Sequence, residues 1–224
     1  FRVMVEDNQQ NKNGIFPPVP VRNPRDVDVS QLKIAYLPKI GDWMPSPAIR
    51  RGLALAADAL RNLGATVEEW SPSGLQQAAE MFFRLVSSDG FSVAKHLLGG
   101  EKPVSLMKPN VQLASMPSIM VKGLTKILRT SGQQHLAAIT GNAKRVSATQ
   151  LMELLFERLK LEQSFNGDLS AAGFDAVVCP ALPLVAPFHN ATLDLADFSG
   201  SLHLFNVLGL PAGVTPVTTV HPGE

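Results

Sequence analysis

Three short segments of the chain have the pattern of buried β-strands. Residues 32–37 (LKIAYL) and 174–179 (FDAVVC) are apolar runs bounded by turn-forming residues, as in strands that are covered on both faces. Residues 65–70 (ATVEEW) follow the first run after a helical segment, and this order predicts a βαβ unit with two parallel strands. Residues 213–220 (GVTPVTTV) are predicted as a final strand, which Pro216 places at a sheet edge or a bulge.

Apolar residues at steps of three and four predict helices between these strands. The first helix is expected to begin at Pro47, with Ser46 as its N-cap, and to end at Gly64. Prolines interrupt residues 101–118, and four prolines between positions 17 and 24 predict an irregular arm over residues 1–31. The alternation of strands and helices indicates an α/β fold. Further helices are expected over residues 74–98, 118–128, 147–170 and 202–208.

Length and composition limit the protein class. The 224 residues are enough for one large domain or two small ones, and we assign residues 32–224 to one ordered domain. An apolar share of 45% excludes disorder of the whole chain. A net charge of +1 shows no basic excess, so no nucleic-acid partner is expected. No signal peptide is visible, and prolines break the longest uncharged stretch, residues 198–223, so it cannot be a spanning helix.

The chain contains no complete catalytic motif. Phosphate-binding loops, dinucleotide fingerprints, zinc-protease motifs and nucleophile elbows are absent, and the five histidines lack ligand spacing, so no metal or cofactor is expected. The single cysteine, Cys179, lies at a strand end where a nucleophile could sit, but a cysteine in such an apolar run is usually structural. Asp89 interrupts an apolar helical face, either as a hydrogen-bonded helix distortion or as a polar group at a pocket wall.

One amphipathic segment, residues 111–140, differs from an ordinary core helix. Its only charged residues are Lys122, Lys126 and Arg129, and it contains no acidic residue. A large apolar face with a basic flank is typical of a helix that lies in a membrane interface. A plain core helix is the alternative, but it does not explain the absence of acidic residues.

Several sequence strings resemble the C-terminal half of amidase-signature enzymes, and in particular their fatty acid amide hydrolase branch. The most specific are residues 44–51 (MPSPAIRR) and 210–220 (LPAGVTPVTTV), and residues 88–90 (SDG) and 136–138 (LAA) add weaker similarity. The resemblance covers about residues 30–220. It implies an α/β fold in which this chain forms part of a mixed β-sheet core covered by helices on both faces.

The resemblance also implies an activity. Enzymes of this branch hydrolyse fatty acid amides and N-acylethanolamines with a serine nucleophile, a second serine and a lysine, all of which lie upstream of the matched part. We therefore expect no catalytic residue in this chain and no hydrolysis by the chain alone. Two alternatives stay open: a non-catalytic lipid- or membrane-binding remnant of the family, and an amidase of another substrate class.

The resemblance further assigns binding roles to positions of this sequence. The implied partners are a lipid amide, a membrane surface and the missing N-terminal half of the enzyme, and a homodimer is left open. Peripheral or monotopic attachment to intracellular membranes is expected, with a cytoplasmic location as the alternative. Residues 113–139 match a membrane-docking cap, whose contacts would be Met116, Ile119, Met120, Leu124, Ile127 and Leu128. The implied substrate-binding residues are Val86, Ser87, Ile139, Thr140, Ala143, Cys179 and Leu202.

Overall fold

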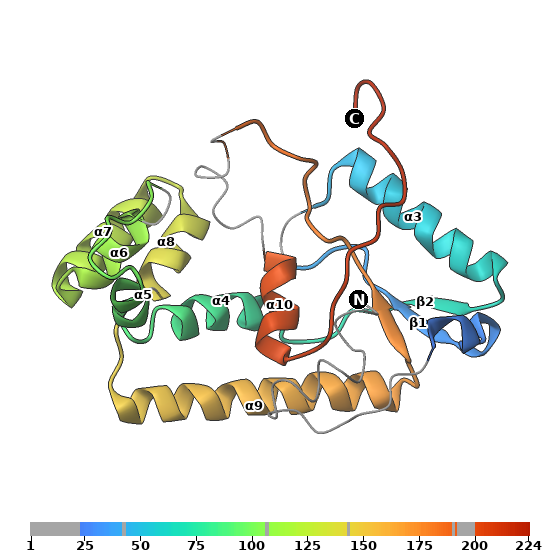
Figure 1. The fold of residues 1–224 in the computed structure, drawn as a ribbon, viewed down its shortest axis with the longest axis horizontal. Helices are drawn as coiled ribbons and strands as arrows, with labels where there is room; N and C mark the ends of the chain where they lie inside the picture. The colour runs from blue at the N-terminus through green and yellow to red at the C-terminus, as the bar shows by residue number, and fades with distance from the viewer. Residues whose placement is uncertain (1–22, 42–43, 106–107, 143, 190, 192–199) are drawn as a thin grey trace.

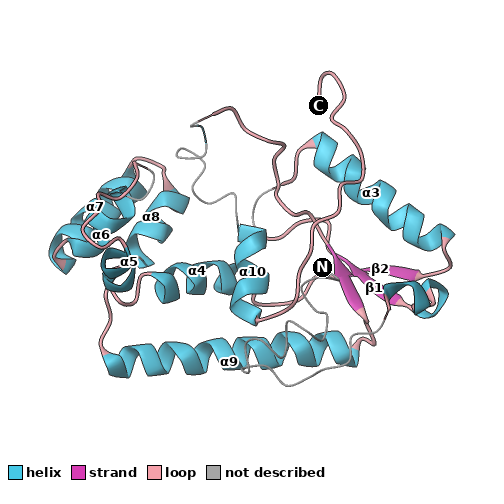
Figure 2. Ribbon diagram, viewed as in Figure 1, coloured by secondary structure: helices cyan, strands magenta, loops and turns pink. Residues whose placement is uncertain are grey.

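Helices form one end of the molecule and a small sheet forms the other (Figure 1). Helices α5 (Ser92–Leu97), α6 (Lys108–Ser115), α7 (Ser118–Thr130) and α8 (Gln134–Asn142) gather at the end far from the strands (Figure 2). Helices α4 (Leu75–Val86) and α9 (Ala148–Ala171) run between the two ends. The computed structural model describes residues 23–41, 44–105, 108–142, 144–189, 191 and 200–224.

Three parallel strands in the order β2–β1–β3 form the sheet of the described residues. They are β1 (Lys33–Tyr36), β2 (Thr66–Glu69) and β3 (Ala176–Val178), each inside a segment that the sequence predicts as a strand. Ile34 and Ala35 are both buried, although successive side chains of a strand point to opposite faces. Both faces of the central strand β1 are therefore covered, whereas most of β2 is exposed and the predicted burial of β3 is only partial. Figure 1 shows α3 (Pro47–Asn62) on one side of the strands and α9 on the other. The predicted α/β fold is confirmed.

Helix α3 (Pro47–Asn62) connects β1 to β2 and begins and ends where the sequence predicts. Pro47 occupies the first turn, where its missing N–H costs no hydrogen bond. Ser46 stands at the N-cap position, but its hydroxyl makes no capping hydrogen bond, so its predicted capping role is wrong. Gly64 follows the helix with a φ of +95°, and a Cβ there would lie 2.8 Å from the Cβ of Ser30. Only glycine fits this helix end.

The main hydrophobic core lies between the sheet and helices α4 (Leu75–Val86), α9 (Ala148–Ala171) and α10 (Gly200–Leu208). Ser147 and Gln150 form a reciprocal capping box that fixes the start of α9. At the other end of α9 the ring of Phe165 meets the edge of Trp70 at a centroid distance of 5.2 Å. The confirmed helix α9 thus packs against the core from Leu154 to Leu169.

The predicted single helix over residues 74–98 is wrong, because the chain breaks it into α4 and α5 (Ser92–Leu97). Gly90 and Phe91 both have positive φ, which reverses the chain between the two helices. The carboxylate of Asp89 accepts hydrogen bonds from the backbone N–H groups of Phe91 and Val93, both at 2.8 Å. Asp89 therefore satisfies donors at the start of α5, in agreement with the hydrogen-bonded distortion proposed for it.

Residues 101–118 are not irregular throughout, because they contain helix α6 (Lys108–Ser115). Pro109 is the second residue of this helix, a position at which proline needs no hydrogen-bond partner. The predicted helix over 118–128 is present as α7 (Ser118–Thr130), and α8 (Gln134–Asn142) follows it.

The predicted final strand over 213–220 is wrong. Residues 209–220 form no regular structure, and the side chains of Val214, Val217 and Val220 are exposed. A strand needs a neighbour for its backbone groups, and no described strand pairs with this segment. At the other end of the chain, the described part of the predicted arm forms two 3₁₀ turns, η1 (Pro24–Asp26) and η2 (Val29–Gln31). The rest of the arm, residues 1–22, lies outside the described residues.

Replacing Leu154 by alanine is expected to lower the free energy of unfolding by about 2–5 kcal/mol, because it opens a cavity in a filled core. Leu154 is 1% exposed, whereas its neighbour Leu155 is 37% exposed. Urea unfolding followed by circular dichroism should show a much smaller loss for the matched variant Leu155→Ala. Equal losses for the two variants would contradict the position of the core.

Candidate functional site

Helices α7 and α8 pack against each other at the end of the molecule far from the sheet. The inner side of α7 contributes Val121 and Thr125, which are buried. The hydroxyl of Thr125 donates to the carbonyl of Val121 at 2.8 Å, so its burial leaves no unsatisfied donor. A Cβ built on Gly141 of α8 would lie 3.5 Å from the Thr125 methyl group, which shows how closely the two helices approach.

The outer side of α7 is apolar and exposed. Ile119 is 78% exposed and Ile127 is 64% exposed, and Met120 is also exposed. Leu124 and Leu128 are half-buried, and Met116 lies exposed just before the helix. The structure therefore gathers all six residues assigned to membrane contact on or beside one helix, and their role stays a prediction. None of the described helices is both apolar enough and long enough to span a bilayer.

A pocket of about 700 Å³ opens beside α7. Three cations of its wall, Lys122, Lys126 and Arg129, are spaced four and three residues apart and so share one side of the helix. Lys144 and Arg145 reach the same pocket from the segment after α8. The remaining lining residues are apolar or small, namely Leu113, Met116, Ser118, Val121, Thr125 and Gly141. Of the residues assigned to substrate binding, Val86, Ser87, Thr140, Cys179 and Leu202 have described side chains, and none of these five lines this pocket.

Four residues assigned to the substrate channel, Val86, Ser87, Thr140 and Leu202, lie around the C-terminal end of α4, whereas Cys179 lies at the end of β3. Helix α4 contacts both α8 and α10, so Ser87 and Thr140 lie in one packed region and both are buried. The Ser87 hydroxyl donates to the carbonyl of Phe83 at 2.6 Å. Val86 and Leu202 are about half exposed. Of the other assigned residues, Ile139 belongs to α8 and Ala143 lies outside the described residues.

A stacked histidine holds α10 against α4, and the sequence pattern gave no sign of it. The ring of His203 lies parallel to that of Phe82 at a centroid distance of 3.8 Å and meets the edge of Phe83 at 5.0 Å. This contact positions α10, and with it Leu202, beside the end of α4. In the sequence, Phe82 and Phe83 are two adjacent aromatic residues on a predicted helix. Such a pair does not indicate which residue packs against it.

Cys179 follows β3 directly and packs against the main core. Burial raises the pKa of its thiol to about 11, so the thiol is neutral at pH 7. Because the thiolate is the reactive form, this cysteine is not an activated nucleophile. The contact of Cys179 with the core therefore favours a structural role over a catalytic one.

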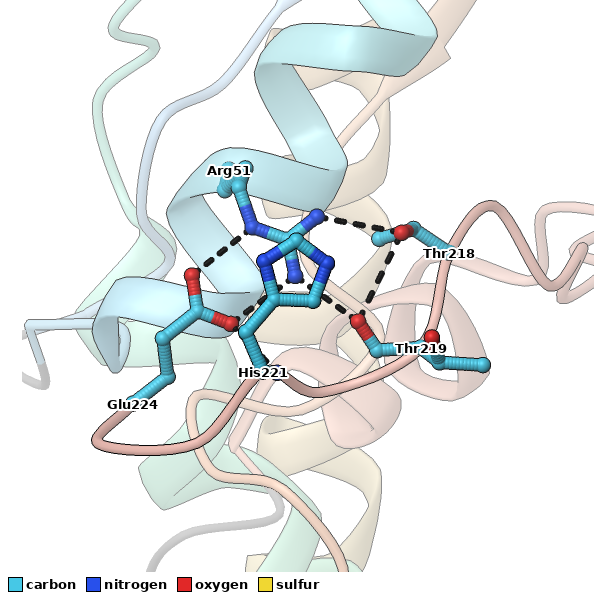
Figure 3. A network of polar contacts seen from close by, with 5 residues as sticks. All are labelled: Arg51, Thr218, Thr219, His221 and Glu224. Carbon is cyan, nitrogen blue, oxygen red and sulfur yellow. Dashed lines mark hydrogen bonds and ion pairs between the residues drawn. The ribbon is translucent and has the colours of Figure 1, made fainter.

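An arginine of α3 binds the C-terminal segment of the chain (Figure 3). Arg51 contacts both carboxylate oxygens of Glu224, through Nε at 2.7 Å and Nη2 at 2.8 Å. It also donates to the Thr218 hydroxyl at 3.0 Å and to the Thr219 carbonyl at 2.7 Å. The network therefore joins the two strings, 44–51 and 210–220, that carry the family resemblance, a pairing that sequence analysis did not find.

This network shifts the titration of both charged partners. The hydrogen bond from Arg51, supported by the backbone N–H of His221, lowers the pKa of Glu224 to about 2. The same pairing raises the pKa of Arg51 above its ordinary value. Since the pKa of Glu224 is depressed in the folded chain, its contribution to stability is present above pH 4.5 and is lost as the pH falls toward 2.

Replacing Arg51 by glutamine is expected to raise the pKa of Glu224 from about 2 toward its ordinary value of 4.5. The physical reason is the loss of a paired cation that favours the carboxylate. An NMR titration of the Glu224 carboxyl carbon would measure the shift. Arg61→Gln removes an exposed arginine that pairs with Asp58, and it should leave the Glu224 titration unchanged. An unshifted Glu224 in the Arg51 variant would show that the network does not form in solution.

The Amidase family model matches residues 1–223 of this chain. Fatty-acid amide hydrolase 1 of Sus scrofa is 27% identical over 221 residues, and fatty acid amide hydrolase 1 of Caenorhabditis elegans is 23% identical over 218 residues. These alignments cover 98% and 97% of this chain but only 38% of each relative. The acetamidase of Emericella nidulans is 24% identical over 188 residues, which cover 84% of this chain and 30% of that protein.

A solved structure of a fatty acid amide hydrolase superposes on the chain with a TM-score of 0.67. The match covers 92% of this chain and 32% of that structure, at 20% sequence identity. The described helices and strands therefore have the arrangement of part of that fold. The chain spans less than two fifths of the length of the relatives it matches.

Proposed function

This chain belongs to the amidase family, and from that membership we propose that it forms part of a serine amidase that hydrolyses fatty acid amides. The observation that carries the proposal is the match of nearly the whole chain to proteins named fatty acid amide hydrolase from two distant animals. The exposed apolar side of α7 supports it, because a water-insoluble amide must reach the enzyme from a membrane.

The proposed role of this chain is to bind the substrate rather than to cleave it. Amide hydrolysis needs an activated nucleophile, proton delivery to the leaving nitrogen and donors for the oxyanion. Cys179 is neutral at pH 7 and does not supply the first of these. We assign the nucleophilic serine, the second serine and the acid–base lysine of the resembling enzymes to a part of the protein outside these residues.

The acyl chain of the substrate would lie against the packed region around the end of α4. Val86 and Leu202 expose apolar surface there, and the buried Ser87 and Thr140 form the wall behind it. Each buried methylene group of an acyl chain contributes about 0.8 kcal/mol to binding. A long acyl chain would therefore supply most of the affinity, and the amine part would contribute little.

Helix α7 would attach the protein to a membrane surface. Its exposed apolar residues lie on the side opposite to the contact with α8, and its cations lie on the flank. This distribution is typical of a helix that lies in the interface plane, with apolar residues inserted and cations among the headgroups. The proposed attachment is thus peripheral. In this orientation the entrance to the acyl-binding site would face the membrane.

Enlarging Leu202 to tryptophan is expected to lower kcat/KM for oleamide at least about tenfold and for hexanamide less than about twofold, because the added ring fills space that only a long chain uses. The assay uses the complete protein that contains this chain. Leu97→Trp, which changes an exposed leucine of α5, is the matched control and should leave both values unchanged.

Two results would contradict the substrate proposal. Equal losses for both amides in the Leu202 variant would show that this residue does not border the acyl chain. Hydrolysis of acetamide but not of oleamide by the unchanged protein would assign it to the short-chain amidases, the alternative that the match to an acetamidase favours.

Replacing Ile119 and Ile127 by glutamate in the complete protein that contains this chain is expected to reduce its sedimentation with phosphatidylcholine vesicles by about tenfold or more, because two inserted side chains become charged. Leu63→Glu is the control, since Leu63 is about as exposed as Ile127 but follows α3 directly, on the sheet side of the molecule. Unchanged sedimentation of the double variant would exclude α7 as the attachment site.

A further inference from the structure

Positive charge is concentrated at the helical end of the molecule. Residues 102–152 contain seven of the 20 lysine and arginine residues and none of the 19 acidic residues. The rest of the chain has 13 basic and 19 acidic residues, so the near-neutral chain is divided into a part with a charge of +7 and a part with −6. Most of the positive part forms α6, α7 and α8, which lie together at one end (Figure 1).

Five of these seven cations converge on the pocket beside α7, which we call the basic pocket. Lys122, Lys126 and Arg129 come from one side of α7, and Lys144 and Arg145 come from the segment after α8. Two separate segments thus bring like charges around one volume of about 700 Å³. Like charges repel at this range, so the arrangement gains free energy when an anion occupies the pocket.

Nothing among the described residues neutralises these charges. None of the five side chains has an ion pair or a hydrogen bond to another described residue, whereas Arg51, Arg84 and Arg158 elsewhere each pair with a carboxylate. The pocket therefore holds cations that are free to bind a ligand from outside this part of the chain.

The surroundings of the basic pocket indicate which anion it takes. Its wall includes Leu113, Met116 and Val121, and the exposed Ile119 and Ile127 lie on the adjoining outer side of α7. A small free anion would use the cations but not this apolar surface. Sites for single-stranded nucleic acids stack bases on aromatic side chains, and residues 108–142 contain no Phe, Tyr or Trp.

We propose that the basic pocket binds the phosphate headgroup of an anionic phospholipid, with the acyl chains of that lipid beside the apolar side of α7. The inference rests on the proposed attachment of α7 to membranes and adds the class of lipid that it recognises. Without aromatic anchors, the helix has only aliphatic and methionine side chains to insert, so headgroup charge would carry a large share of the binding. The acidic remainder of the chain would be repelled from the same surface, which orients the molecule.

The test compares sedimentation of the complete protein that contains this chain with vesicles of phosphatidylcholine alone and with vesicles that also contain phosphatidylglycerol. We expect tighter binding to the anionic vesicles, and a decline of that preference as sodium chloride is raised. The variant Lys122→Gln/Lys126→Gln should bind anionic vesicles about tenfold more weakly and neutral vesicles as before. The matched control Lys39→Gln/Lys160→Gln removes the same charge from exposed positions outside the pocket and should keep the preference.

The outcomes separate this inference from the proposed attachment. Equal binding to neutral and anionic vesicles would overturn the headgroup site and leave membrane attachment by α7 standing. Binding to neither vesicle would overturn both. An equal loss in the two double variants would also overturn the headgroup site, because it would show that only net charge matters. Thermal unfolding by circular dichroism verifies that each variant is folded as the parent chain is.

Discussion

The packing of α4 against three other helices is the contact on which the rest of the structure depends. Helix α4 touches α9 and α10 along the main core and α8 at the helical end. Its residues Ala78 and Met81 are almost completely buried in that core. The stacked ring of His203 and the exposed Arg84–Glu157 pair add contacts from both sides. Because α4 makes all these contacts, its position in the core determines where the α7–α8 pair lies relative to the sheet.

This arrangement separates two kinds of surface. At the sheet end, these cations are paired with carboxylates: Arg51 binds Glu224, and Lys33 binds Glu68 at 3.0 Å. At the helical end, the five cations of the basic pocket have no acidic partner among the described residues, and they border an apolar helix face. Paired charges stabilise the position of a segment, whereas unpaired charges of one sign attract a ligand of the opposite sign. The proposed membrane contact belongs to the second kind of surface.

Sequence reasoning succeeded where short-range rules decide the structure. The three strands of the sheet, α3 and α9 follow from the apolar period and from the positions of proline and glycine. It failed where a single backbone feature overrides a continuous pattern. The apolar period runs on through residues 74–98, but the positive φ of Phe91 and the carboxylate of Asp89 divide the helix. It also failed at α6, because Pro109 lies at the second position of a helix, where proline is tolerated.

The sequence by itself determined the α/β class, most helices and strands, the family and the basic, acid-free character of residues 111–140, because these depend on residue types and their spacing. Only the tertiary structure decided that Arg51 meets Glu224, that His203 stacks on Phe82, and that Lys144 and Arg145 join the cations of α7 around one pocket. In the tertiary structure, residues 213–220 form no strand, although their sequence pattern predicts a strand. The physical reason is the same in each case: such contacts join residues far apart in the chain, and their partners are chosen by packing rather than by local pattern.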